Sequence, residues 1–234
     1  MNPPAVPVHL VFDLLAVLSA GLMTWAVWLW RLSDLPRNPL RPGNERYFAA
    51  LSVGILIGSY VLGTGNLWLS GVPAIGRSIE GALAGGILAV ELYKARSGIS
   101  GSTGLVFVPT FATLVAVGRI GCALSGLEDH TYGLPTTLPW GHDFGDGIPR
   151  HPVAVYESLA MAGFLALSLA AFARRNPYFS AHGFHLMVAF YAAQRFAWEF
   201  LKPYATLLGP LNLFHLTSMV LFAYAAVMLV RRPK

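Results

Sequence analysis

The chain has 234 residues, of which 55% are hydrophobic and only 12% are charged. Soluble domains carry about 25% charged residues, so the composition excludes an ordinary soluble protein and indicates an integral membrane protein. The net charge of +5 does not indicate nucleic-acid binding, because the basic residues gather in short segments between apolar runs. The single cysteine, Cys122, cannot form a disulfide within the chain and therefore gives no information on the redox compartment.

Seven apolar runs follow one another along the chain, and most are close to the roughly 20 residues that a helix needs to cross a bilayer. The third run is short and glycine-rich, which suggests a tilted or partly buried helix. The sequence therefore predicts an all-α polytopic membrane protein with a single transmembrane domain over residues 1–234. The predicted spans are Leu10–Trp30, Tyr47–Leu69, Ser78–Tyr93, Gly104–Gly126, Pro152–Phe172, His182–Leu201 and Leu211–Val230.

The start of the chain, MNPPAVPVH, has no basic segment before the first apolar run. That run is long for a signal-peptide core and has no obvious cleavage site, so we expect a retained first helix.

Lysine and arginine are concentrated in alternate connecting segments. Because cytoplasmic loops carry the excess of basic residues, this bias predicts seven helices with the N-terminus outside and the C-terminus in the cytoplasm. The predicted outer side carries only Arg77, Arg150 and Lys202. The predicted cytoplasmic side carries Arg31, Arg37, Arg41, Arg46, Lys94, Arg96, Arg174, Arg175, Arg231, Arg232 and Lys234.

Two pairs of glycines have the spacing that lets membrane helices approach closely. Gly54 and Gly58 lie in the second run, and Gly81 and Gly85 lie in the third. Small residues four positions apart form a shallow strip on one helix face. We expect ordinary helix packing at these positions, without a catalytic role.

Arg119 and Arg195 each lie inside a long apolar stretch. An ionisable side chain at membrane depth costs roughly 3 kcal/mol or more, so it is retained where it faces a cavity or a partner. Arginine is also the natural bidentate partner of phosphate. The two arginines therefore predict a site for a lipid phosphate. The alternative is structural pairing, for example of Arg195 with Glu199 four residues later.

The connection between the fourth and fifth runs, residues 127–151, differs from the others. It is long, and its glycines, prolines and aromatic residues favour an ordered, turn-rich structure. The predicted topology places it outside, directly after the helix that carries Arg119, so we expect the chemistry at the outer leaflet. Its polar residues include Glu128, Asp129, His130, Tyr132, His142, Asp143, Asp146, Arg150 and His151.

Several reaction classes lack their motifs in this chain. The sequence contains no HExxH, no convincing metal-ligand spacing, no GxSxG elbow, and no glycine-rich phosphate loop of the GxGxxG or GxxxxGK[ST] kind. We therefore expect no metal and no cofactor. Arginines for phosphate, with acids or histidines for proton transfer, suit displacement on a phospholipid headgroup.

One stretch of the chain carries a specific combination of motifs. Gly118-Arg119-Ile120-Gly121, Tyr132-Gly133, Leu138-Pro139-Trp140-Gly141, Arg150-His151-Pro152 and Tyr156-Glu157 resemble the signature region of prolipoprotein diacylglyceryl transferases. The resemblance extends more weakly to residues 78–85 and 191–199, where Arg195 and Glu199 fit the family's late helix. Over the first 70 residues it amounts to little more than topology.

The resemblance implies a membrane transferase in the bacterial cytoplasmic membrane. Members of the family move the diacylglyceryl group of phosphatidylglycerol to the cysteine thiol of a lipoprotein precursor, releasing glycerol phosphate. Arg119 and Arg195 would hold the phosphodiester, and His151 or a carboxylate such as Glu80 would be the base that a thiol nucleophile needs. The residues expected to bind substrate are Arg119, Arg195, Arg150, Tyr156, Glu157, Glu199, Cys122, Tyr132 and Gly133.

The chain departs from the family pattern at three positions. Glu80 stands where the family has histidine, Cys122 where it has asparagine, and Phe12, followed by Asp13, where it has tyrosine. Phosphate handling is thus expected to be retained, while proton handling and the acceptor side are altered. The chain resembles a divergent member or paralogue.

Alternative roles stay open for the single residues. Glu80 is either a base or a structural partner of Arg77 or Arg119, and His151 is either a base or a helix cap. Cys122 is more readily interpreted as a packing residue than as a nucleophile. Tyr156 and Glu157 contact substrate or brace the loop, and Glu199 orients Arg195.

Two alternatives to lipoprotein modification also stay open. One is the same donor chemistry on another small-molecule, peptide or glycan acceptor. The other is a non-catalytic phospholipid-binding protein that retains the phosphate site.

Overall fold

A computed structural model describes residues 8–33, 39–40 and 43–231. The first seven residues and four of the basic residues used to predict orientation (Arg37, Arg41, Arg232 and Lys234) lie outside these ranges. Within them the chain forms seven α-helices and two short β-hairpins. The helices are α1 (Val8–Val27), α2 (Glu45–Leu69), α3 (Ile79–Ser97), α4 (Phe107–Ser125), α5 (Val153–Ala173), α6 (Pro177–Glu199) and α7 (Leu213–Val230).

Five of the seven helices in the described ranges are long and apolar enough to cross a membrane. They are Val8–Leu32, in which α1 continues as the π-helix η1 (Trp28–Leu32), and α2, α4, α5 and α7. The prediction of a polytopic, mainly helical membrane protein is thereby confirmed. The other two helices, α3 and α6, carry the charged residues Glu80, Glu91, Arg195 and Glu199, and whether they also span stays a prediction.

The described residues pack as two compact units. Among the described residues, unit 1 comprises residues 8–32, 106–180 and 197–203, and unit 2 comprises residues 33, 39–40, 43–105, 181–196 and 204–231. Most of α6 thus belongs to unit 2, while its first and last residues belong to unit 1.

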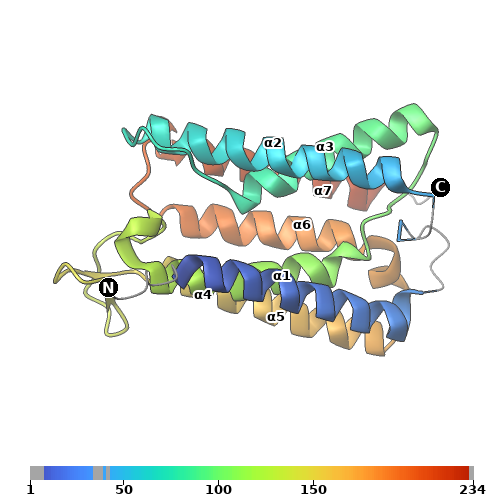
Figure 1. Ribbon diagram of the computed structural model, residues 1–234, viewed down its shortest axis with the longest axis horizontal. Coiled ribbons are helices and arrows are strands. Elements are labelled where there is room, and N and C mark those ends of the chain that lie inside the picture. Colours follow the sequence, from blue (N-terminus) through green and yellow to red (C-terminus); the bar gives the residue numbers. More distant parts are fainter. Residues whose placement is uncertain (1–7, 34–38, 41–42, 232–234) are drawn as a thin grey trace, which may run out of the picture. The chain divides into compact units, whose positions relative to one another are not determined.

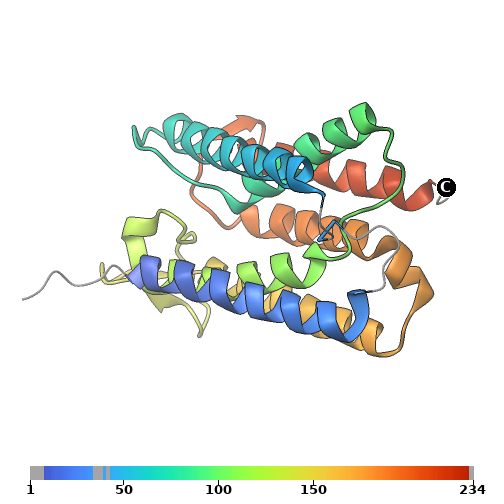
Figure 2. The same ribbon diagram turned by 45° about the vertical axis from the view of Figure 1, so that its right-hand side comes forward.

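Unit 1 is built from α1, α4 and α5, which run side by side (Figure 1 and Figure 2). The hydroxyls of Thr24 and Thr110 join α1 to α4 at 2.6 Å. A side chain at Gly121 of α4 would collide with Phe12 of α1. The glycine therefore lets the two helices approach closely and brings the end of α4 against the start of α1.

Unit 2 contains α2, α3, α7 and the middle of α6. α2 and α3 lie against each other along the two glycine pairs, as the spacing predicts (Figure 1). A Cβ at Gly54 would meet the backbone of Gly85, and one at Gly58 would meet the backbone of Gly81. Only glycine allows two helix backbones this close.

Polar caps fix where α3 and α7 of unit 2 begin. The Ser78 side chain accepts a hydrogen bond from the Gly81 amide, which starts α3 and places Glu80 in its first turn. Asn212 and His215 form a reciprocal capping box that starts α7. Each cap satisfies backbone donors that the helix itself leaves without partners.

The segment between α4 and α5 is built from turns and a hairpin. It contains the short helix η2 (Gly126–Asp129) and the antiparallel strands β1 (His142–Asp143) and β2 (Pro149–Arg150). Backbone hydrogen bonds join Leu134 to Leu201 and His151 to Leu134, which ties the segment to the residues after α6. A second hairpin, β3 (Thr206–Leu208) and β4 (Leu211–Asn212), leads into α7.

Candidate active site

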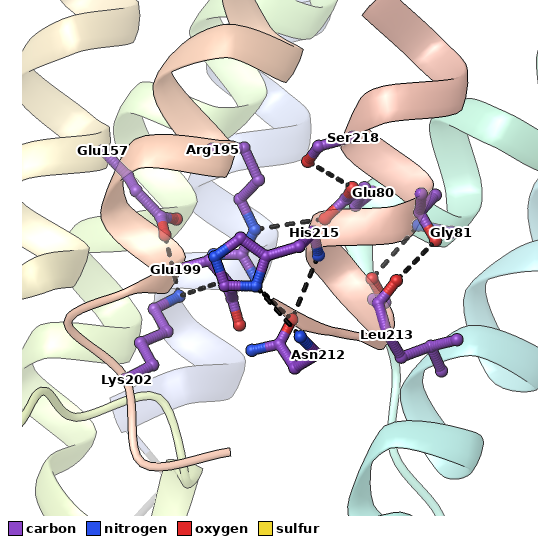
Figure 3. A network of polar contacts seen from close by, with 12 residues as sticks. Glu80, Gly81, Glu157, Arg195, Glu199, Lys202, Asn212, Leu213, His215 and Ser218 are labelled. Atoms are coloured by element: carbon purple, nitrogen blue, oxygen red, sulfur yellow. Dashed lines mark hydrogen bonds and ion pairs between the residues drawn. The ribbon is translucent and has the colours of Figure 1, made fainter. Parts of the chain in front are cut away.

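A cluster of four charged side chains lies in unit 1, and we call it the Glu157 cluster (Arg119, Glu157, Glu199 and Lys202). Glu157 of α5 is fully buried. Its carboxylate forms an ion pair with Arg119, at 2.5 Å from Nε to Oε2. It also accepts from Lys202 Nζ at 2.8 Å, and Lys202 Nζ lies 3.9 Å from Glu199 Oε2 (Figure 3). Two acids and two bases balance in charge, as burial at membrane depth requires.

Lys202 is a functional candidate that the sequence reasoning missed. The basic-residue pattern places Lys202 in an outer loop, and the structure buries its side chain in the Glu157 cluster. Its position three residues after Glu199, at helical spacing, could have indicated the pairing.

A second cluster lies in unit 2, and we call it the Glu80 cluster (Glu80, Arg195, Phe214 and Ser218). Fully buried Glu80 accepts from Arg195 Nε at 3.2 Å and from Ser218 Oγ at 2.7 Å (Figure 3). The Arg195 guanidinium also packs over the Phe214 ring at 4.8 Å.

The sequence named Arg77 and Arg119 as possible structural partners of Glu80, and the structure adds contacts with Arg195 and Ser218. Arg195 lies 115 residues away from Glu80 in the chain and Ser218 lies 138 away. No local spacing could have indicated either contact.

His151 belongs to a group of aromatic side chains in unit 1. Its Nδ1 lies 3.4 Å from the Tyr156 hydroxyl, which accepts from Trp140 Nε1 at 2.8 Å. The Tyr156 ring also packs against Trp198, at 5.3 Å between centroids. Because Tyr156 immediately precedes Glu157 on α5, this group adjoins the Glu157 cluster.

Arg150, Tyr132 and Gly133 shape the segment between α4 and α5. Arg150 pairs with Asp146 and packs over the Tyr132 ring at 5.4 Å. The hydrogen bond from Arg150 lowers the pKa of the exposed Asp146 carboxyl, and the same bond raises the pKa of Arg150. A Cβ at Gly133 would collide with the backbone of His151. These contacts order the loop around His151.

Cys122 lies near the end of α4, beside the Glu157 cluster. Its Sγ is 3.9 Å from Arg119 Nη1 and 3.8 Å from His9 Nε2, and His9 Nδ1 is 3.1 Å from Asp13 Oδ2. The sequence reasoning did not single out His9, because it lies 113 residues from Cys122. Among the described residues, no group of three or more His, Cys, Asp or Glu side chains is placed to hold a metal ion.

The structure thus brings several predicted residues together in pairs: Arg119 with Glu157, Arg195 with Glu80, and His151 with Tyr156. Glu199, expected to orient Arg195, faces Lys202. Arg119 belongs to unit 1 and Arg195 to unit 2, and their sharing of one phosphate stays a prediction.

Comparison with known proteins adds an independent observation. The sequence pattern of the family described as prolipoprotein diacylglyceryl transferase matches residues 17–231. A phosphatidylglycerol–prolipoprotein diacylglyceryl transferase of Geobacter sulfurreducens is 32% identical over 200 residues, covering 77% of this chain and 75% of the relative.

Other relatives match over shorter stretches. The protein of the same name from Nitratidesulfovibrio vulgaris strain DP4 is 34% identical over 158 residues, covering 66% of this chain and 58% of the relative. Phosphatidylglycerol–prolipoprotein diacylglyceryl transferase 2 of Streptomyces coelicolor is 37% identical over 139 residues, covering 53% and 43%. The matched part is thus about half the length of these two relatives. No solved structure matches the chain significantly.

Proposed function

Since this chain belongs to the prolipoprotein diacylglyceryl transferase family, we propose that it transfers the diacylglyceryl group of phosphatidylglycerol to an outward-facing acceptor. The leading acceptor is the cysteine thiol of a lipoprotein precursor. The donor and acceptor are those in the names of its relatives.

The observation that carries this proposal is the pair of buried arginines, each held by a carboxylate. Glu157 binds Arg119 and Glu80 binds Arg195, in both cases through Nε. A carboxylate at Nε fixes the plane of the guanidinium, and a fixed guanidinium fork suits a phosphodiester. A preorganised cation also stabilises the charge that develops on a leaving phosphate.

The proposed reaction is a displacement at the glycerol carbon that carries the phosphate. The acceptor sulfur forms a bond to that carbon, the carbon–oxygen bond to phosphate breaks, and glycerol phosphate leaves. The thiol proton passes to a base, because a neutral thiol is a weak nucleophile.

The contacts favour His151 over Glu80 as that base. Both carboxylate oxygens of Glu80 already accept hydrogen bonds, from Arg195 and Ser218, which suits a positioning role toward Arg195. His151 lies within reach of the Tyr156 hydroxyl beside the Glu157 cluster. An imidazole there is suited to general base catalysis near neutral pH.

We also propose where the protein lies and how it is oriented. All seven helices span the bacterial cytoplasmic membrane as one domain over residues 1–234, with the N-terminus outside. The reaction takes place near the outer leaflet, where the segment between α4 and α5 faces the acceptor. The lysine and arginine bias supports this orientation.

The test uses the full chain in liposomes with phosphatidylglycerol labelled in its diacylglyceryl part, with and without a lipobox peptide. We expect label on the peptide thiol, and loss of at least about a hundredfold in rate for Arg119→Ala and Arg195→Ala. Lysine at either position should restore only part of the rate, because it lacks the bidentate fork. The exposed Arg174 provides a matched control, Arg174→Ala, which should keep the full rate.

Other outcomes separate the alternatives. Label that moves to another added acceptor, but not to the peptide, supports the same donor chemistry on a different acceptor. Lipid binding without any transfer supports a non-catalytic phospholipid-binding protein, and unchanged lipid binding in both alanine variants contradicts the phosphate site.

The base assignment needs its own variants. His151→Gln should abolish transfer and spare lipid binding, whereas Glu80→Gln should weaken lipid binding through Arg195. If Glu80→Gln instead abolishes transfer and spares lipid binding, Glu80 is the base. Glu80→His together with Cys122→Asn restores the family pattern and should raise activity on the peptide.

A further inference from the structure

Cys122, His9 and Asp13 of unit 1 form a chain of polar contacts, and we call it the thiol site. Cys122 Sγ lies 3.8 Å from His9 Nε2, and His9 Nδ1 lies 3.1 Å from Asp13 Oδ2. A thiol, an imidazole and a carboxylate in this order are the components of a nucleophilic cysteine site.

The helix packing of unit 1 explains how these residues meet. His9 and Asp13 are four residues apart on α1 and therefore lie on one face of that helix. Gly121 directly precedes Cys122 on α4, and it packs against Phe12 of α1. The close approach of α1 and α4 at this glycine brings the cysteine against the histidine.

The charges around Cys122 determine how reactive its sulfur is. The end of a helix carries a partial negative charge, which disfavours a thiolate at the C-terminal turns of α4. Arg119, one turn earlier on α4, opposes this with Nη1 3.9 Å from Sγ. A cation and an imidazole beside a thiol favour the thiolate form.

The surroundings of the thiol site indicate which substrate reaches it. The side chains of His9 and Asp13 are 29% and 35% exposed, and Cys122 is half-buried. Large apolar side chains on the same two helices are exposed nearby in the chain, namely Leu10, Leu14 and Leu124. In a membrane helix, such side chains contact lipid.

From this geometry we infer that Cys122 is a nucleophile that takes an acyl chain from the ester of a membrane glycerolipid and holds it as a thioester. This activity goes beyond diacylglyceryl transfer and does not depend on it. Asp13 accepts from His9 Nδ1–H, which leaves Nε2 to accept the thiol proton.

The two steps balance without an added oxidant or reductant. In the first, His9 takes the Cys122 proton, sulfur bonds to the ester carbonyl carbon, and the carbon–oxygen bond breaks. His9 returns its proton to the released lipid alcohol, while the Arg119 guanidinium faces the negative oxygen. In the second, a water or an acceptor alcohol gives its proton to His9 and attacks the thioester, and Cys122 regains its proton.

The experiment uses the purified full chain in liposomes of phosphatidylglycerol and phosphatidylethanolamine with labelled acyl chains. We expect acid-stable label on Cys122 that neutral hydroxylamine removes, or release of labelled fatty acid that depends on Cys122. Cys122→Ala should abolish both. His9→Asn should slow both by about a hundredfold or more, the usual contribution of a general base, and should also slow alkylation of Cys122 by iodoacetamide.

Thr113→Val is the matched control, because Thr113 is a buried polar residue on the same helix and lies outside the thiol site. It should keep the labelling. Three results would overturn the inference: neither label nor Cys122-dependent fatty acid, label that resists hydroxylamine and is therefore a thioether, or label that persists in Cys122→Ala. Diacylglyceryl transfer to a lipobox peptide, measured in the same samples, tests the proposed function separately.

Discussion

The two buried carboxylates, Glu80 and Glu157, differ in what holds them. Glu157 forms ion pairs with two cations, Arg119 and Lys202, whereas Glu80 accepts hydrogen bonds from the Arg195 cation and the Ser218 hydroxyl. Removing a charge from water is expensive, and a buried pair is retained only when its partners remain in place. The Glu157 cluster therefore combines a role in stability with the proposed role in orienting Arg119.

Replacing Glu157 tests that double role. Glu157→Gln should destabilise the protein by about 3–5 kcal/mol, because it leaves two cations buried around a neutral amide. Thermal unfolding in detergent measures the effect, and adding Lys202→Met should recover part of the loss. Asp146→Asn, in the exposed pair with Arg150, is the control and should leave the unfolding temperature nearly unchanged. Equal stability of Glu157→Gln and wild type would show that the cluster is solvated.

Gln194 of α6 differs from the two buried carboxylates in its hydrogen bonding. Both polar atoms of its side-chain amide are buried and lack a hydrogen-bond partner within the described part of the chain. Leaving a buried polar group without a partner costs about 1–3 kcal/mol. Gln194→Met keeps the length of the side chain and should therefore retain or raise stability, by up to about 1 kcal/mol.

The matched control for Gln194 is the amide of Asn212, which caps α7 through the His215 backbone. Asn212→Leu should destabilise by about 1 kcal/mol, measured in the same unfolding assay. A clear loss of stability in Gln194→Met would mean that the amide makes hydrogen bonds in the folded protein.

At the scale of elements, α3 and α6 are the two described helices outside the five candidate membrane spans, and both carry buried charged residues. α3 provides Glu80, and α6 provides Arg195 and Glu199. Their polar faces are covered by neighbouring helices, as Ser218 and Phe214 of α7 do for Glu80 and Arg195. A helix of this kind is stable in a membrane when its partners cover its polar side chains.

The packing of α2 on α3 makes a prediction at this scale. Gly58→Leu or Gly81→Leu should destabilise the protein by about 3 kcal/mol or more, because the added side chain meets the backbone of the facing helix, which cannot rotate away. The control is Gly163→Ala on α5, where a Cβ would meet nothing within 4 Å. Folding yield in membranes and unfolding in detergent measure the effect. Tolerance of leucine at both positions would contradict the close approach of the two backbones.

At the scale of the whole molecule, the five strongly apolar helices and the family pattern over residues 17–231 establish a multi-pass membrane protein. The basic residues then assign a side to each connection. Arg174 and Arg175 follow α5, and the segment of residues 127–151 is on the opposite side if all seven helices span.

Labelling of single cysteines tests this orientation. In a Cys122→Ser background, cysteines at Thr136 and Pro139 should react with an impermeant thiol reagent in intact cells, and a cysteine at Arg175 should react only after lysis. A cysteine at Arg37 should behave like the one at Arg175, although that position lies outside the described residues. Reaction at Arg175 in intact cells would reverse the topology and move the chemistry to the inner leaflet.

Sequence alone was sufficient for the helical membrane class and for the family. Apolar runs of about 20 residues form helices in a bilayer, because a helix satisfies its backbone groups within the segment. The observed bounds of α5, Val153–Ala173, differ from those predicted by one residue at each end. The motifs around Arg119 and His151 are local in the chain, so they could be recognised without a structure.

Only the tertiary structure decided which side chains act together. Lys202 reaches Glu157 from 45 residues away, Ser218 reaches Glu80 from 138, and His9 reaches Cys122 from 113. These contacts depend on how whole helices pack, with Gly121 setting the approach of α1 to α4. Helical periodicity relates a residue only to neighbours three or four positions away. Contacts between helices therefore follow only from the way the helices pack in the tertiary structure.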